Sequence, residues 1–253
     1  MNNAAENTAA SMSVARTPST TTERERPRLG LLRATFGIIA KDFLLEWRGR
    51  ARINATIFFA VLTLLLFSFA VGPHHAILEQ NAPGYLWLAI MLASVMSLGE
   101  SQRVEAENAA LEGLRLLALD PRAIYLGKSI VNMLFLMALA LVLVPVSIAL
   151  YGTTIRAGMG PLFSPLLLGT AAISAPGTLY AAIAVQARAR DVLLPLLLFP
   201  ILIPGLLAAV KATSLVLTGD PMGELVSWTM LLGAFNVVYW ILCGLLFGRV
   251  IEE

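Results

Sequence analysis

The chain has 253 residues, of which 58% are hydrophobic and 13% are charged, and its mean hydropathy is +0.78. A soluble domain has roughly 25% charged residues, so this chain has too few polar side chains to cover a water-soluble globule. The composition excludes a soluble protein and predicts an all-α integral membrane protein. The net charge of +2 is uninformative by itself, but the positions of the charges along the chain are informative.

The chain begins with a polar segment. Residues 1–29 are rich in Ala, Ser, Thr, Asn and Arg and show no apolar periodicity, which predicts a disordered cytoplasmic tail. No apolar segment with a cleavage site follows the arginines directly, so this tail does not resemble a secretory signal peptide. Residues 30–253 are then predicted to form one transmembrane domain.

The first periodic segment is Leu31–Trp47. Its apolar residues recur at helical spacing, and its basic residues fall elsewhere on the helical wheel. This pattern predicts an amphipathic helix that lies in the membrane interface. The apolar stripe consists of Leu32, Phe36, Ile39, Phe43 and Trp47, and a basic collar follows at Arg48, Arg50 and Arg52.

Six apolar segments follow, and none of them contains Lys, Arg, Asp or Glu. A charge at the centre of a bilayer costs about 2.5–3.5 kcal/mol on insertion scales, so this absence predicts that all six cross the membrane. We expect the second to be short. The segments are Ile53–Val71, Pro83–Leu98, Ile130–Tyr151, Leu162–Val185, Val192–Val210 and Leu225–Phe247.

The basic residues predict the orientation of the spans. Of the 18 Lys and Arg residues, all but Arg156 and Lys211 fall in the termini or in alternate connections on one side. Because cytoplasmic loops are enriched in Lys and Arg, both termini are predicted to be cytoplasmic. The outer connections are then 72–82, 152–161 and 211–224. Aromatic residues favour membrane interfaces, so we expect Tyr85, Trp87, Tyr151 and Trp228 near the outer interface.

The longest charged run between spans is Glu100–Lys128, on the predicted cytoplasmic side. It is predicted to be helical to about Leu119, which places a coupling helix at about residues 100–120. Asp120 and Pro121 then provide an N-cap and a first helical residue for the next helix. Such a polar helix is suited to docking with a soluble motor protein, although a solvated loop helix is the alternative.

Two spans contain features of close packing or bending. The fourth has a run of small residues from Gly169 to Gly177 that ends in Pro176-Gly177, and small residues let helices approach closely. The fifth contains Pro195, Pro200 and Pro204, each of which removes a backbone donor. Both features indicate either ordinary bundle packing or a hinge or homodimer interface.

Residues with evident chemistry are few. His74 and His75 are the only histidines, and they are either solvated or ligate a metal or haem iron. Cys243 is expected to be a buried apolar residue, and Asn132 and Asn236 to form interhelical hydrogen bonds. Lys128 is expected to extend its charged end towards the cytoplasmic edge of its span.

Two chemical functions are disfavoured. The GKS sequence at 127–129 is not a phosphate-binding loop, because Arg122 occupies the position of the first glycine. No carboxylate or lysine lies within a predicted span to relay protons or bind coupling ions, so a proton-driven or ion-driven transporter is also disfavoured.

Two blocks carry a family resemblance. The first is Glu107-Asn-Ala-Ala-Leu-Glu-Gly-Leu114, followed by Pro121 and Ile124-Tyr-Leu-Gly-Lys128, and the second is Ala175-Pro-Gly-Thr-Leu-Tyr180. Together with the proline-rich fifth span and the order of helices, these blocks resemble the haem-exporter B (CcmB-like) family. This family is the permease subunit of the ABC transporter for cytochrome c maturation. The resemblance covers roughly residues 31–249.

The resemblance implies a permease homodimer with an ABC-2-like architecture in the bacterial inner membrane. It implies two copies of a separate ATPase subunit that binds ATP, a haem-handling membrane subunit and a periplasmic haem chaperone, with haem handled by the complex and no nucleic acid. The implied ATPase-coupling residues are Glu107, Leu111, Glu112, Gly113, Leu114, Arg188, Arg190 and Asp191. Two alternatives stay open: an ABC-2 type permease that exports a lipid, drug or glycan, and a non-transporting assembly scaffold.

Overall fold

The computed structural model describes residues 31–107, 120–185 and 190–252, and all regular elements in these ranges are α-helices. Within these ranges, six helices are long and apolar enough to cross a membrane, and the shorter α1 precedes them. The predicted order of one short helix and six spans is therefore confirmed. The helices are α1 (Leu31–Arg48), α2 (Arg50–Val71), α3 (His75–Glu107), α5 (Pro121–Tyr151), α6 (Met159–Val185), α7 (Arg190–Thr218) and α8 (Glu224–Glu252).

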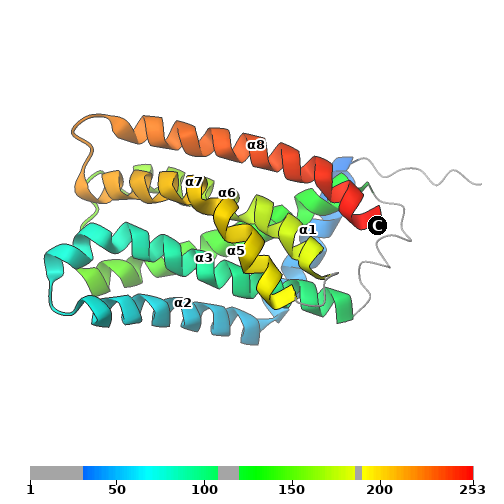
Figure 1. Ribbon diagram of the computed structural model, residues 1–253, viewed down its shortest axis with the longest axis horizontal. Helices are drawn as coiled ribbons and strands as arrows, with labels where there is room; N and C mark the ends of the chain where they lie inside the picture. The colour runs from blue at the N-terminus through cyan, green and yellow to red at the C-terminus, as the bar shows by residue number, and fades with distance from the viewer. Residues whose placement is uncertain (1–30, 108–119, 186–189, 253) are drawn as a thin grey trace, which may run out of the picture.

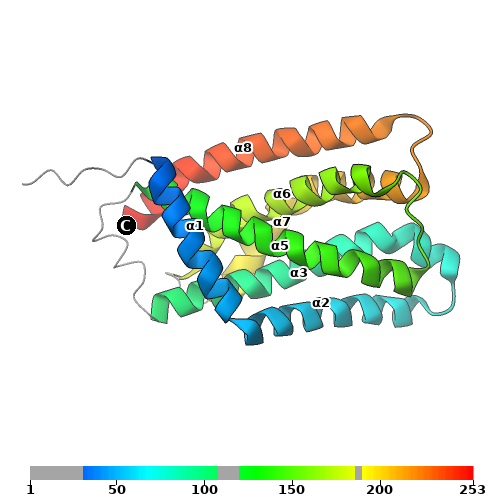
Figure 2. The same ribbon diagram turned by 180° about the vertical axis from the view of Figure 1, so that it is seen from behind.

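The spans lie side by side as a bundle, with α2 and α8 at opposite edges and α6 in the interior (Figure 1). Helix α6 packs against α3, α5, α7 and α8. Its run of small residues explains this position, because Ala171, Ala172, Ser174 and Ala175 let neighbouring backbones approach closely. Helix α1 crosses one end of the bundle at a steep angle to the spans (Figure 2).

Asp120 caps α5 as the sequence predicts. Its Oδ1 accepts a hydrogen bond from the backbone N–H of Arg122 over 2.9 Å, and Pro121 occupies the first turn. At the opposite end of the bundle, α2 and α5 end at glycines with positive φ, Gly72 (71°) and Gly152 (68°). Glycine adopts this conformation without the steric cost of a Cβ atom, so each helix stops there and a short turn begins.

The second span is not short, which corrects the prediction. Helix α3 has 33 residues and begins at His75 rather than Pro83. Its first turns contain polar residues, so the apolar pattern of the sequence does not include them. They are nevertheless helical and amphipathic, because Gln80 and Asn81 are exposed while Leu78 is buried. The first connection is therefore only Gly72–His74. Lys211, likewise, lies inside α7 and not in a connection, with its side chain exposed.

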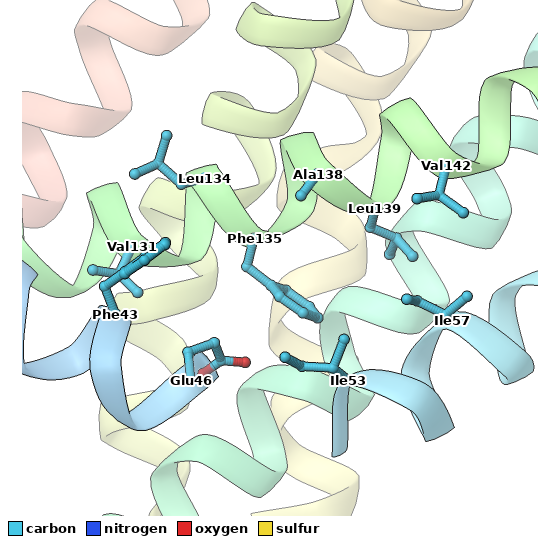
Figure 3. Close-up of a pocket in the computed structure, with 10 residues that line it drawn as sticks. All are labelled: Phe43, Glu46, Ile53, Ile57, Val131, Leu134, Phe135, Ala138, Leu139 and Val142. Carbon is cyan, nitrogen blue, oxygen red and sulfur yellow. The ribbon is translucent and has the colours of Figure 1, made fainter. Parts of the chain in front are cut away.

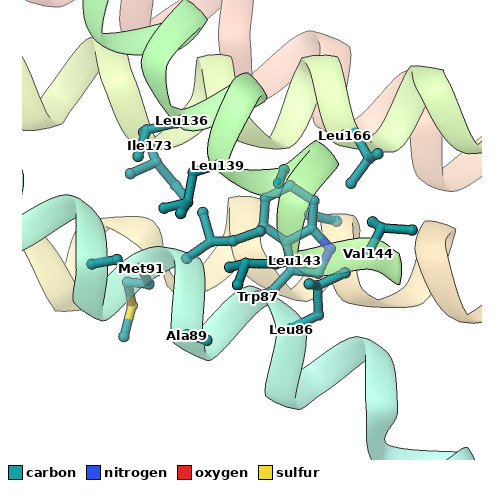
Figure 4. Close-up of a cluster of buried hydrophobic side chains, with 14 of the residues drawn as sticks. Leu86, Trp87, Ala89, Met91, Leu136, Leu139, Leu143, Val144, Leu166 and Ile173 are labelled. Carbon is teal, nitrogen blue, oxygen red and sulfur yellow. The ribbon is translucent and has the colours of Figure 1, made fainter. Parts of the chain in front are cut away.

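The core contains the indole ring of Trp87, which the sequence predicts at the outer membrane interface. Trp87 is 1% exposed, and it lies among Leu86, Leu139, Leu143 and other apolar side chains (Figure 4). Its Nε1–H donates to Thr213 Oγ1 of α7 over 2.9 Å. The prediction of an interfacial Trp87 was wrong, because an internal hydroxyl satisfies the indole N–H that would otherwise need a water or a lipid headgroup.

Tyr151 is the last residue of α5, so it lies at the end of the bundle that the sequence predicts to face outwards. The ring is buried, and its hydroxyl donates to the backbone carbonyl of Leu64 over 2.8 Å, which joins α5 to α2. Tyr85 is half-buried, with its ring stacked on Phe67 at a centroid distance of 4.6 Å. These aromatic rings therefore connect helices near one end of the bundle.

The predicted interhelical hydrogen bonds of both asparagines are confirmed. Asn132 of α5 donates to Ser174 Oγ of α6 over 3.1 Å, and Ser174 donates in turn to the Ser129 carbonyl over 2.6 Å. Asn236 of α8 donates to the Leu168 carbonyl of α6 over 2.9 Å. Bonds of this kind contribute about 0.6–2 kcal/mol each between membrane helices, so α6 is held by polar as well as steric contacts.

We expect Gly169→Ala to destabilise the bundle. A Cβ atom at Gly169 of α6 would lie within 2.6 Å of Trp87 Cζ2, and overpacking of this kind costs about 1–3 kcal/mol. The matched control is Gly233→Ala in α8, where a Cβ atom meets nothing within 4 Å. Thermal unfolding of both variants in detergent tests this expectation. Equal melting temperatures for Gly169→Ala and the wild type would contradict the close contact with Trp87.

Candidate coupling site

One end of the bundle gathers the features that the sequence assigns to coupling. Helix α1 crosses this end, where α3 and α8 finish and α5 and α7 begin (Figures 1 and 2). Helix α1 packs mainly on the first turns of α5. The site is therefore described from the contact between α1 and α5 outwards.

The contact between α1 and α5 depends on Gly127. A Cβ atom at this position would lie within 2.6 Å of Ile38 Cγ2 in α1, so any larger residue would push the two helices apart. Ile38 is 4% exposed and fits into the space over the glycine. Gly127 belongs to the first block of the family resemblance, and the contact gives a physical reason for glycine there.

A buried ion pair lies beside this contact. Lys128 Nζ of α5 is 3.8 Å from Asp42 Oδ2 of α1, and their side chains are 7% and 11% exposed. The prediction that Lys128 extends to the cytoplasmic edge was wrong, because Gly127 brings α1 directly over this side chain. Lys41 Nζ lies 3.0 Å from the other oxygen of the same carboxylate, Asp42 Oδ1, so Asp42 contacts two lysines.

A second ion pair joins α1 to α2. Arg52 of α2 contacts the Glu46 carboxylate of α1, and both side chains are mostly buried. Burial raises the pKa of Glu46, and the charge of Arg52 together with its hydrogen bond to the carboxylate opposes that rise. The two ion pairs together attach one face of α1 to the first and third spans.

The opposite face of α1 consists of large apolar side chains. Phe36 is 73% exposed and Phe43 is 48% exposed, whereas Ala34, Thr35, Ile38 and Asp42 are buried. Two of the predicted stripe residues therefore project away from the bundle. This arrangement suits a helix with one face on the protein and the other in the membrane interface, as the sequence predicts.

The two blocks of the family resemblance meet in space. The Tyr125 hydroxyl of the first block donates to the Ala175 carbonyl of the second over 3.3 Å. Tyr125 is fully buried and packs with Leu179, Phe247 and Ile38 in one apolar cluster. The Ile124–Lys128 part of the first block is therefore a packing element that holds α1, α6 and α8 around α5.

Most of the predicted ATPase-coupling residues lie outside the described structure. This applies to Leu111, Glu112, Gly113, Leu114 and Arg188. Glu107 is the last residue of α3, and Arg190 and Asp191 open α7, with only their backbone described. The coupling role of all eight residues stays a prediction.

The predicted packing glycines lie at close contacts. Gly169 faces the Trp87 ring, and a Cβ atom at Gly177 would lie within 2.7 Å of Leu98 Cδ1 of α3. Pro176 lies beside Gly177 inside α6, which continues without interruption from Met159 to Val185. These contacts favour the packing interpretation of Gly169 and Gly177, because a Cβ atom at either position would collide with a neighbouring helix.

The three prolines of the fifth span lie inside α7, which changes direction part-way along its length (Figure 1). Proline removes a hydrogen bond and its ring clashes with the preceding turn, so a bend is the expected consequence. Pro200 and Pro204 are exposed and Pro195 is partly buried. A bend is present, and its use as a hinge stays a prediction.

The remaining candidates differ in their surroundings. His74 lies in the turn before α3, His75 is the first residue of α3, and both are exposed. The described part of the chain contains no cluster of three or more His, Cys, Asp or Glu residues suited to a metal. Their role as haem or metal ligands stays a prediction. Cys243 is 2% exposed, so its prediction as a buried apolar residue is confirmed.

Sequence reasoning missed Asp42 and the coupling of Trp87 to α7. The signal for Asp42 was present, because Thr35, Ile38 and Asp42 recur at helical spacing on the face opposite Phe36. Asp42 and Glu46, two acids one turn apart on that face, indicate buried partners on other helices. No pattern in the sequence indicates that Trp87 reaches Thr213, since the two residues are 126 positions apart.

These features define a multi-pass helical membrane protein, the membrane subunit of a transporter. Residues 33–252 match the family described as CcmB protein, and the chain belongs to that family. It is 33% identical to heme exporter protein B of Pseudomonas aeruginosa over 193 residues, which cover 76% of this chain and 85% of the relative. It is 29% identical to heme exporter protein B of Bradyrhizobium diazoefficiens over 214 residues, 84% of this chain and 90% of the relative.

We expect Asp42→Leu to weaken the attachment of α1, because it leaves Lys128 buried without this carboxylate. The double variant Asp42→Leu with Lys128→Met removes both charges and should recover most of the loss. Hydrogen exchange of α1 amides, together with thermal unfolding in detergent, measures both effects. Arg33→Ala is the control, because Arg33 is an exposed residue of the same helix and an exposed charge should contribute little. Equal exchange in Asp42→Leu and Arg33→Ala would contradict the role of the pair.

Proposed function

We propose that this chain is the permease subunit of an ABC transporter for cytochrome c maturation, in which a separate ATPase supplies the energy. Two lines of support combine: membership of the CcmB family and similarity to relatives named heme exporter protein B. The observation that carries the proposal is that the two sequence blocks typical of the family meet at Tyr125 and Ala175, beside the end of the bundle crossed by α1.

The proposal assigns sides to the bundle. Both termini and the end crossed by α1 face the cytoplasm of a bacterial inner membrane, since most Lys and Arg residues lie there. Residues 1–29 form a cytoplasmic tail and residues 100–120 a coupling helix. The connections at Gly72, Gly152 and Gly219 then face the periplasm.

The proposed mechanism begins at the connection between α3 and α5. Two ATPase copies bind a permease homodimer through residues 107–114. They also bind at the connection between α6 and α7, where Arg188, Arg190 and Asp191 are the proposed contact residues. A displacement there reaches α5 directly, because Asp120 starts this helix. It reaches α1 through Gly127 and the Asp42–Lys128 pair, so α1 and α5 move as one unit.

The complex uses the energy of ATP hydrolysis either to deliver haem or to release a haem-loaded chaperone. In this proposal, haem is handled by the complex, with a haem-handling membrane subunit and a periplasmic chaperone as further partners. His74 and His75 belong to the proposed periplasmic side, where exposed imidazoles are available to a haem-bearing partner. The bend in α7 at its three prolines is the proposed hinge for the transport movement.

Deletion of the gene should abolish covalent haem attachment to c-type cytochromes, and the wild-type chain should restore it. Haem-stained gels of membrane and periplasmic fractions measure the effect. Restoration by the Glu112→Lys variant described below should be reduced. A b-type cytochrome, which holds haem without covalent attachment, serves as the control for haem supply. Unchanged c-type cytochromes after deletion would overturn the proposed function.

We expect Glu112→Lys to weaken ATPase association without changing membrane insertion. The residue lies in the matched block on the proposed cytoplasmic side, where a reversed charge would oppose its partner. The control is Glu224→Lys, an exposed reversal at the start of α8 on the proposed periplasmic side. Co-purification of the ATPase from solubilised membranes measures association. Equal recovery of the ATPase with both variants would show that Glu112 does not take part in the contact.

A further inference from the structure

An apolar groove lies between α1, α2 and α5. Phe43 and Glu46 of α1 border one end, Ile53 and Ile57 of α2 form one wall, and α5 forms the other (Figure 3). The groove is partly open and has a volume of about 170 Å³. The wall from α5 consists of Val131, Leu134, Phe135, Ala138, Leu139 and Val142.

The shape of the groove suits a thin flexible chain. Its α5 wall is a single stripe at helical spacing from Val131 to Val142, which corresponds to about 16 Å along the axis at 1.5 Å per residue. An apolar cavity of about 150 Å³ holds one benzene molecule, so this groove has room for a hydrocarbon chain but not for a porphyrin. A helix of a second copy, about 10 Å wide, is also too thick to enter it.

The end of the groove near α1 has a polar edge that suits an anion. Arg50 is exposed and lies on the same face of α2 as Ile53 and Ile57, at spacings of three and seven residues. The N-terminus of α2 has Gly49 as its cap and no side-chain cap hydrogen bond. Helix N-termini favour anions through their free N–H groups, and a guanidinium adds a full positive charge.

Glu46 does not oppose an anion at this edge. Its carboxylate is paired with Arg52, so the two opposite charges largely cancel. The net charge of the edge therefore comes from Arg50.

We propose that this groove binds one anionic phospholipid, with an acyl chain along α5 and its phosphate at Arg50 and the N-terminus of α2. An amphiphile with a hydrocarbon tail next to a negative headgroup is the ligand that matches both halves of the site. Membrane lipid has direct access, because the groove opens beside two apolar spans. The bound lipid fills the space between α1 and α2 that protein side chains leave open. This site does not depend on haem.

The acyl chain is tested with a phosphatidylglycerol that carries a photoreactive diazirine in its tail, using the full chain in nanodiscs. Labelling should concentrate on the α5 segment 131–142 and on Ile53 and Ile57. Ala138→Phe fills the groove and should remove most of this labelling. Ala149→Phe is the control, because it adds the same ring to an exposed position of α5 outside the groove. Even labelling of all exposed helix faces, or equal labelling in both variants, would overturn the proposal.

The headgroup is tested by native mass spectrometry in nanodiscs that contain phosphatidylglycerol and phosphatidylethanolamine. Arg50→Gln should lower the retained ratio of phosphatidylglycerol to phosphatidylethanolamine by about fivefold, since one basic residue near a membrane surface contributes about 1 kcal/mol. The control is Arg249→Gln, an exposed arginine near the end of α8. An unchanged ratio, or protection of the groove by a second copy of the chain, would overturn the proposal. Arg50 is exposed, so this variant keeps the test valid if Ala138→Phe fails to fold.

Discussion

The arrangement of the proposed cytoplasmic end depends on the close approach of α1 to α5 at Gly127. Without a Cβ at this position, Ile38 descends onto the α5 backbone, and Asp42 comes within reach of Lys128. The lysine is covered as a result, and its charge is paired with the aspartate. One missing side chain therefore creates both the steric contact and the electrostatic one.

The centre of the bundle follows the same rule at Gly169. The absence of a side chain there admits the Trp87 ring, and the indole N–H then reaches Thr213. Helices α3, α6 and α7 are joined at one point as a result. The two contacts lie on helices that border the proposed ATPase-binding connections. In our account, α5 and α1 carry movement along the cytoplasmic side, and α3 and α7 carry it into the core.

The sequence predicts much of the architecture, because the bilayer imposes simple requirements. Local chemistry is enough to predict three features. These are the six spans, from their lack of charged residues; the N-cap at Asp120; and the interhelical hydrogen bonds of Asn132 and Asn236. The sequence does not predict a side chain's partner when that partner lies on another helix. Nothing local to Trp87 or Lys128 shows that the first finds a hydroxyl and the second an acid within the fold. Apolar periodicity also missed the polar first turns of α3. The assignment of a coupling role to residues 107–114 comes from the family resemblance.

The most direct test of the account is to separate α1 from α5 at Gly127 and to measure maturation of c-type cytochromes. Gly127→Leu places a side chain where Ile38 lies and should push the two helices apart. Gly37→Leu is the control, because a Cβ atom at this exposed position of α1 meets nothing within 4 Å. If α1 and α5 must move as one unit, Gly127→Leu lowers covalent haem attachment and Gly37→Leu retains it. Equal maturation in the two variants would contradict the account.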